Sequence, residues 1–204
     1  MDFLLDKNLS EIPFSKINEK EYLPKLKELI KDAHDQIEVF KSNQETPGFK
    51  NTCVGLEEIS AKVNSLVTVF FNLNHANTTD YLQEIAREIS PMLTDFGNDI
   101  SLDKDIFKRV KSVYERRDSL NLSKEELRLL EKQYKDFVRN GALLSDSEKD
   151  ELRLIDKDLS STTLKFGQNV LAARKEYQLI LENEEDLAGL PGDVVVACKE
   201  EAKS

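Results

Sequence analysis

Two histidines and two cysteines are the residues of this 204-residue chain best suited to nucleophilic or metal chemistry. A nucleophilic site built on histidine needs that residue beside a serine or cysteine, but His34 and His75 fall on different expected elements. We therefore expect each to be a half-exposed helix residue or a loop contact. Cys53 and Cys198 lie far apart in the chain, and we expect them to be small apolar fillers in a reducing compartment rather than a disulfide.

The familiar metal and phosphate motifs do not occur in the sequence. A zinc site usually shows spacing such as HExxH or CxxC, and P-loops or dinucleotide fingerprints need clustered glycines. The acidic run "ENEED" at 182–186 lacks the alternating ligands and central glycine of a calcium loop, so we expect a solvated acidic turn. The sequence thus predicts no catalytic residue, no cofactor-binding residue and no metal ligand among these positions.

Charge and hydropathy restrict the classes of partner. The formal net charge is −10, whereas a nucleic-acid binder needs a concentrated basic stripe, and in "ERRD" at 115–118 acids flank the two arginines. No stretch approaches the roughly 20 apolar residues of a membrane span, and the start "MDFLLDKNLSE" lacks the basic region of a signal peptide. We therefore expect no nucleic-acid partner, no membrane contact and a cytoplasmic location.

The elements that would position these residues are almost all helices. Apolar residues make up 39% of the chain and charged residues 33%, and only seven glycines and five prolines are present, which argues against a β-sandwich or barrel. Apolar residues spaced by three and four predict helices over about 19–43, 52–74, 82–97, 102–119, 123–139 and 145–175, with a last helical run over 194–202. The predicted fold class is all-α, a multi-helix antiparallel bundle-like lobe of about six to seven helices. At most one short strand is expected, near 177–182.

Cap and turn residues mark where the expected helices begin, bend and end. Ser123 with Glu126 and Ser145 with Glu148 form the spacing of capping boxes, and Gly141 suits a left-handed C-cap. "NQETPGF" should end the first helix, Pro91 should bend the third, and Asp193 should cap the last. Gly167 inside the sixth helix weakens that helix by roughly 1 kcal/mol relative to alanine.

Each long helix carries an apolar row that we expect to face the core. In the first four helices these rows are Tyr22, Leu26, Leu29, Ala33, Ile37 and Phe40; Leu56, Ile59, Val63, Leu66, Phe70 and Leu73; Leu82, Ile85, Ile89, Leu93 and Phe96; and Ile106, Phe107, Val110, Val113 and Tyr114. The sixth helix has an expected inward row with the 3.5-residue period of a bundle seam: Leu152, Ile155, Leu159, Thr163, Phe166, Val170 and Ala173.

Several stretches together resemble the M3-family zinc metallopeptidases. They are "IPFSKINEKEYLPKLKELI", "VFFNLNHANTTDYLQEIAREISPML", "RLLEKQYKDFVRNGALL", "LSSTTLKFGQNVLAA" and "ENEEDLAGLP". They follow the family's order from about Ile12 to Pro191, and they are most similar to the peptidyl-dipeptidase branch and the oligopeptidase A type. Gly192 departs from the acidic residue that relatives commonly place there.

The resemblance implies a catalytic region much further along the chain of the parent enzyme. There an HExxH helix and a downstream glutamate hold zinc, which polarises the scissile carbonyl and activates water. None of those positions exists in this sequence, so no catalytic residue carries over to it. The resemblance further implies that residues 1–204 are a single helical N-terminal lobe that forms one wall of a deep channel, cut before the catalytic zinc domain.

The expected function is that of a channel-wall lobe of a zinc-dependent oligopeptidase, inert by itself. It would have no cofactor of its own, and zinc would belong to the parent enzyme. Its partners in the parent would be the oligopeptide substrate and the missing catalytic domain, with residues 177–204 at the junction. An exposed docking face on the fifth helix, the end of the sixth and residues 177–204 should cause weak self-association.

Two other functions lead to different expectations. A natural stop codon after Ser204 would support a free-standing helical interaction module, whereas a reading frame continuing to an HExxH would favour the peptidase. A helical DNA-binding protein conflicts with the net negative charge.

Overall fold

A computed structural model describes residues 1–6 and 11–202, and the described residues contain helices and loops but no strand. The seven α-helices are α1 (Tyr22–Ser42), α2 (Gly55–Ala76), α3 (Asp80–Ser101), α4 (Lys104–Glu115), α5 (Lys124–Arg139), α6 (Asp146–Glu176) and α7 (Gly192–Glu201). The prediction of an all-α fold with six to seven helices is confirmed. The segment 177–182, where at most one strand was expected, is irregular.

Short turns complete the secondary structure. Five are 3-10 turns, at Asp2–Leu5, Phe14–Lys16, Glu19–Glu21, Arg117–Ser119 and Glu184–Leu187, and one is a π-helical turn, η4 (Phe49–Val54), that leads directly into α2. The chain divides into two compact units, Met1–Leu164 and Lys165–Ser204. The assignment of all 204 residues to one lobe of a longer enzyme stays a prediction.

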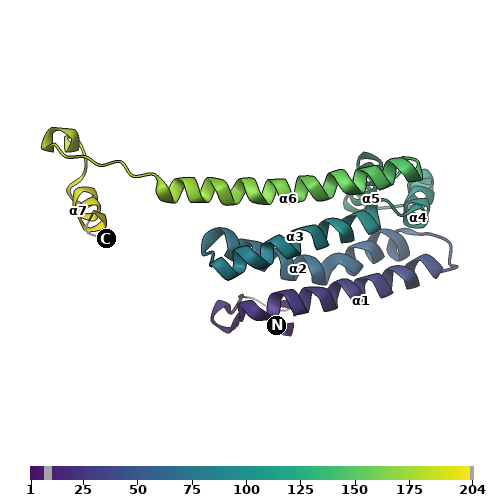
Figure 1. Ribbon diagram of the computed structural model, residues 1–204. Coiled ribbons are helices and arrows are strands. Elements are labelled where there is room, and N and C mark those ends of the chain that lie inside the picture. The colour runs from purple at the N-terminus through teal and green to yellow at the C-terminus, as the bar shows by residue number, and fades with distance from the viewer. Residues whose placement is uncertain (7–10, 203–204) are drawn as a thin grey trace. The chain divides into compact units, whose positions relative to one another are not determined.

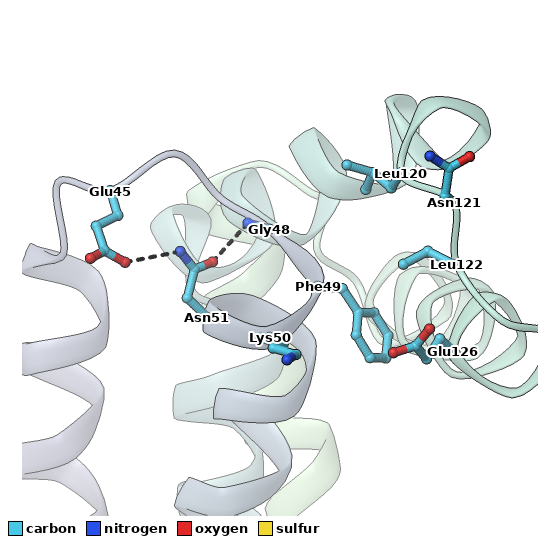
Figure 2. A pocket seen from close by; sticks show the side chains of 9 residues that line it. All are labelled: Glu45, Gly48, Phe49, Lys50, Asn51, Leu120, Asn121, Leu122 and Glu126. Carbon is cyan, nitrogen blue, oxygen red and sulfur yellow. Dashed lines mark hydrogen bonds between the residues drawn. The ribbon is translucent and has the colours of Figure 1, made fainter.

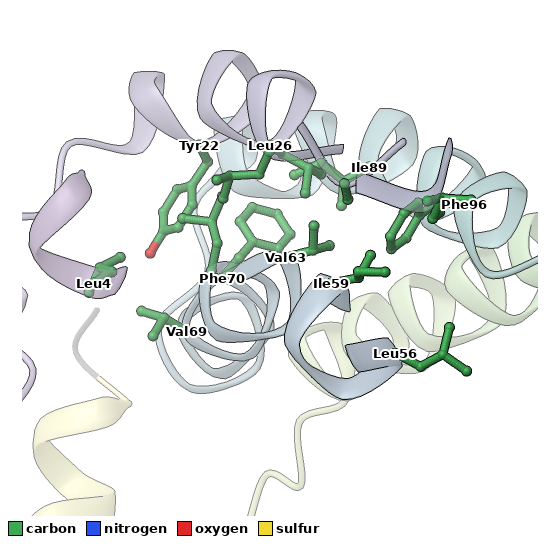
Figure 3. Close-up of a cluster of buried hydrophobic side chains, with 14 of the residues drawn as sticks. Leu4, Tyr22, Leu26, Leu56, Ile59, Val63, Val69, Phe70, Ile89 and Phe96 are labelled. Atoms are coloured by element: carbon green, nitrogen blue, oxygen red, sulfur yellow. The ribbon is translucent and has the colours of Figure 1, made fainter. Parts of the chain in front are cut away.

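The first unit is built on three consecutive helices, α1, α2 and α3, that run alternately up and down (Figure 1). All six apolar residues predicted to face inward from α1 are buried, as are five of the six predicted on α2. Tyr22 of α1 meets Phe70 of α2 edge to face, with 5.1 Å between ring centroids, near the Leu4 end of the buried cluster (Figure 3). The three-and-four spacing of apolar residues therefore identified the core of this bundle.

A second layer of the first unit is the hairpin of α4 and α5. Tyr114 of α4 stacks on Tyr134 of α5 with ring centroids 3.9 Å apart, and Phe107 continues the aromatic column toward Phe137. The turn η4 packs against both helices. Because the column is shared by both helices, it fixes their register.

The predicted caps are present in the structure. The Ser123 Oγ accepts from the Glu126 backbone N–H at 3.2 Å, and the Glu126 carboxylate accepts from the Ser123 N–H at 2.9 Å. Ser145 and Glu148 form the same reciprocal pair at the start of α6. Gly141 has φ 93°, the left-handed conformation expected after α5.

Three helix boundaries differ from those expected. α3 remains helical through Pro91 as far as Ser101, and the Asp103 carboxylate then caps α4 by accepting from two backbone N–H groups at 2.8 and 2.9 Å. α4 ends at Glu115, and a 3-10 turn covers the last residues of the predicted helix. Asp193 is not the cap of α7, because that helix already begins at Gly192.

The predicted inward row of α6 is wrong. Leu152 is half-buried, and the remaining members of the row are exposed: Ile155, Leu159, Thr163, Phe166, Val170 and Ala173. The first part of α6 instead lies along α3 by its polar side (Figure 1). The reason is that carboxylates and helix-end carbonyls of α3 need hydrogen-bond donors or positive charges. The cationic side chains spaced along the polar side of α6 supply them, and an apolar row could not.

Candidate functional site

His34 belongs to a polar cluster that connects three helices of the first unit. Its Nε2 lies 3.1 Å from a carboxylate oxygen of Asp99 on α3, and Arg153 of α6 donates to the other oxygen at 2.8 Å. The imidazole packs edge-on against Phe96. Its side chain is 43% exposed, so the prediction of a half-exposed helix residue is confirmed. Asp99 is thus shared between His34 of α1 and Arg153 of α6, and it links both helices to α3.

The second histidine and the cysteines do not join this cluster. His75 lies exposed in the last turn of α2, with its ring 6.2 Å from that of Phe71. Cys53 is fully buried at η4, and burial, together with the nearby Glu57 carboxylate, raises the pKa of its thiol to about 12. Cys198 lies exposed on α7, so the expectation of an apolar filler is confirmed for Cys53 and wrong for Cys198.

The acidic run at 182–186 forms a turn, as expected. Asn183 donates to the Asp186 carboxylate at 3.2 Å, and the adjoining residues form a 3-10 turn. Within residues 1–6 and 11–202, no three His, Cys, Asp or Glu side chains are placed to hold a metal ion. The described side chains therefore do not fit a zinc ion. In the same part of the chain, no helix has the length and apolar character needed to cross a bilayer.

A hollow of about 550 Å³ opens on the first unit between two connecting segments (Figure 2). One side is formed by residues 45–51, and the other by residues 120–126. Phe49, Leu120 and Leu122 give it an apolar lining, and the charged side chains at its rim are Glu45, Lys50 and Glu126. Its lining includes no histidine, cysteine or serine, and its apolar part offers a surface for binding an apolar group.

Three polar side chains fix the shape of this hollow. Asn51 accepts from the Gly48 N–H at 2.7 Å and donates to the Glu45 carboxylate at 3.3 Å, which closes the 45–51 segment on itself (Figure 2). Arg109 donates to the Asn43 carbonyl at 2.7 Å, and Arg116 donates to the Pro47 carbonyl. Arg116 is one of the two arginines of "ERRD", and it holds the 45–51 segment in place.

The buried polar residues were missed by the sequence analysis. Arg109 is only 9% exposed, and its guanidinium lies over the Phe40 ring at 5.1 Å. Its position three residues after Ile106 placed it on the inward side of α4, and this spacing could have revealed it. Gln133 donates to the Cys53 carbonyl at 3.1 Å and to the Glu57 carboxylate at 2.8 Å. These residues are far apart in the sequence, so no local pattern predicts their contact.

Comparison with known proteins finds relatives that match this chain along most of its length. The chain is 32% identical to the dipeptidyl carboxypeptidase of Escherichia coli over 190 residues, which is 93% of this chain and 28% of that protein. It is 33% identical to the dipeptidyl carboxypeptidase of Salmonella typhimurium over 91% of this chain and 28% of that protein. The chain is homologous to one region of the M3 peptidases.

A more distant M3 peptidase matches over a similar length. Oligopeptidase A of Haemophilus influenzae is 26% identical over 94% of this chain and 28% of that protein. No protein-family model matches the chain. The chain thus spans about 28% of the length of these M3 relatives, although nearly all of its own length is matched.

Proposed function

We propose that these 204 residues are the N-terminal helical lobe of a longer zinc-dependent M3 peptidase, most similar to a peptidyl-dipeptidase. In this proposal the lobe forms one wall of the channel that admits oligopeptides, while zinc and the catalytic residues belong to the remaining region. The observation that carries the proposal is the match along 93% of this chain to 28% of a dipeptidyl carboxypeptidase. A cytoplasmic location is part of the same proposal.

The composition of the described site supports this division of roles. His34 lies beside Asp99, Cys53 is buried, and the lining of the hollow includes no histidine, cysteine or serine. In this proposal the lobe supplies shape and surface, and the groups that hydrolyse peptides belong to the remaining region.

The proposal is tested by comparing two products of the same gene. The 204-residue chain and the full reading frame are purified, their zinc content is measured, and both are incubated with a short peptide that has a free C-terminus. We expect the full product to retain zinc and to release dipeptides in a chelator-sensitive reaction, and the 204-residue chain to do neither. Stoichiometric zinc and chelator-sensitive cleavage by the 204-residue chain would contradict the proposal.

The alternative function is a free-standing helical interaction module. It is favoured by the exposed apolar side chains of α6, which a binding module would use directly. A natural stop codon immediately after Ser204 would support this alternative, and a reading frame that continues to an HExxH would exclude it.

A further inference from the structure

α6 uses its polar side to attach to the rest of the first unit. Lys149 is only 5% exposed, and its ammonium donates to the Leu102 carbonyl at the end of α3 at 2.8 Å. Arg153 pairs with Asp99, and farther along the helix Lys157 pairs with Asp95 at 3.2 Å. The positive charges meet carbonyls and carboxylates near the negative end of the α3 dipole, where cations are stabilised. All three basic residues of 146–164 are used in this attachment.

The opposite side of α6 presents apolar residues that nothing in the first unit covers. Ile155 is 54% exposed and Leu159 is 61% exposed, and their spacing of four places them one above the other on the helix. We call these two residues the α6 apolar face. Farther along the same helix, Phe166 and Val170 in the second unit repeat the spacing of four and are also exposed. A row of this kind is typical of a helix that buries it against another surface.

Acidic residues border the α6 apolar face. By helical geometry, Glu151 and Asp158 lie on one side of it and Asp156 on the other. Residues 146–164 contain six acidic and three basic side chains, which gives 3 − 6 = −3. Because the three basic residues are turned toward α3, the apolar face has a negative border, which favours a partner with a basic rim.

We propose that the α6 apolar face is the surface on which the remaining region of the parent peptidase docks, through an apolar patch bordered by Lys or Arg. This inference rests on the proposed function. Two observations select this occupant: the matched peptidases are more than three times as long as this chain, and the border of the face is acidic. A second copy of the chain would bring two acidic borders together, and like charges placed across an interface oppose association.

The test uses two sets of substitutions in the 204-residue chain. Ile155→Ala with Leu159→Ala removes the apolar face, while Leu154→Ala is the matched control, because Leu154 is 67% exposed but points about 100° away from Ile155 around the helix. Alanine maintains the helix, and neither set touches the core. The remainder of the reading frame, produced as a separate polypeptide, is titrated with each chain by calorimetry at low and high salt.

We expect the double substitution to raise the dissociation constant about tenfold or more, and the control to change it by less than about twofold. Binding of the unsubstituted chain should weaken at high salt, since opposite charges attract across the border. Equal affinity for all three chains would overturn the docking inference, while dipeptide release by the full product would still uphold the proposed function. A second result would also overturn the docking inference. In it, sedimentation shows a tight dimer that the double substitution abolishes, and the chain does not bind the remainder; the occupant of the face is then a second copy of the chain. A reading frame that ends at Ser204 would overturn both the docking inference and the proposed function.

Discussion

Cys53 and Cys198 carry the same side chain in opposite surroundings. Cys53 lies fully buried where η4 meets α2, and burial with the Glu57 carboxylate raises its thiol pKa to about 12. Cys198 lies exposed on α7. Because only the thiolate reacts quickly and only an accessible thiol meets a reagent, the two should differ in reactivity.

We predict that one thiol per chain reacts with a thiol reagent at pH 8 in the folded state and two react after denaturation. Cys198→Ser should remove the rapid reaction, whereas Cys53→Ser should leave it unchanged. The release of a coloured leaving group over time provides the measurement. Rapid labelling of the Cys198→Ser chain without denaturant would show that Cys53 is accessible.

The burial of Tyr22 should make the free energy of unfolding depend on pH in the alkaline range. Its side chain is fully buried, its hydroxyl finds no hydrogen-bond partner among the described residues, and burial raises its pKa from 10.0 to about 12. The unfolded phenol therefore ionises first, so stability that is fully present below pH 10 is lost as pH rises toward 12. The loss from this group should be on the order of 2 kcal/mol.

Tyr22→Phe should reduce this alkaline loss and should be at least as stable as the original chain at pH 7, because it removes an unpaired buried hydroxyl. Urea unfolding at several pH values measures both effects. Tyr177→Phe is the control, since Tyr177 is 73% exposed. An alkaline loss in Tyr22→Phe as large as in the original chain would refute the assignment to this phenol.

At the scale of elements, the loop between α5 and α6 depends on one glycine. Gly141 has φ 93°, and a Cβ at this position would lie 2.7 Å from a methyl carbon of Leu152 and 2.9 Å from one of Leu144. The left-handed conformation and the crowding both disfavour any larger residue. Gly97 inside α3 has no atom within 4 Å of an added Cβ outside its own helix.

We predict that Gly141→Ala lowers the free energy of unfolding by about 1–3 kcal/mol. Gly97→Ala should raise it by about 0.5–1 kcal/mol, because alanine loses less backbone entropy in a helix. Chemical denaturation of both variants measures the difference in sign. If both substitutions stabilise the chain, the strained turn described here is wrong.

At the scale of the whole molecule, the net charge of −10 acts against association of like copies. Large apolar side chains are nevertheless exposed on α6 and from Tyr177 onward, whereas no large exposed hydrophobic residue lies on α5. The predicted docking face is therefore better supported for α6 and residues 177–204 than for the fifth helix. Self-association itself remains a prediction.

We predict weak self-association that strengthens as salt is raised from about 0.05 M to 0.5 M, because salt screens the repulsion between acidic surfaces while apolar contacts persist. Sedimentation velocity over a range of protein concentrations measures it. Ile155→Ala with Leu159→Ala should shift the chain toward monomer. A strict monomer at high concentration and high salt would contradict the prediction.

The sequence by itself determined the helical class, the core rows of α1 to α3 and the caps at Ser123, Ser145 and Gly141. These features depend on local physics: a helix must repeat its apolar residues every three or four positions, and its first N–H groups must find nearby acceptors. The resemblance to M3 peptidases rested instead on particular stretches of residues, such as "ENEEDLAGLP", in the family's order.

Only the tertiary structure decided which side of α6 faces the bundle. The apolar row of that helix predicted burial, yet Lys149, Arg153 and Lys157 attach it to α3 by the opposite side. The cluster of His34 with Asp99 and the contact of Gln133 with Cys53 were likewise absent from any local pattern. Each joins residues more than forty positions apart, and the pairing of such distant polar groups depends on how whole helices pack rather than on the spacing of residues within one helix.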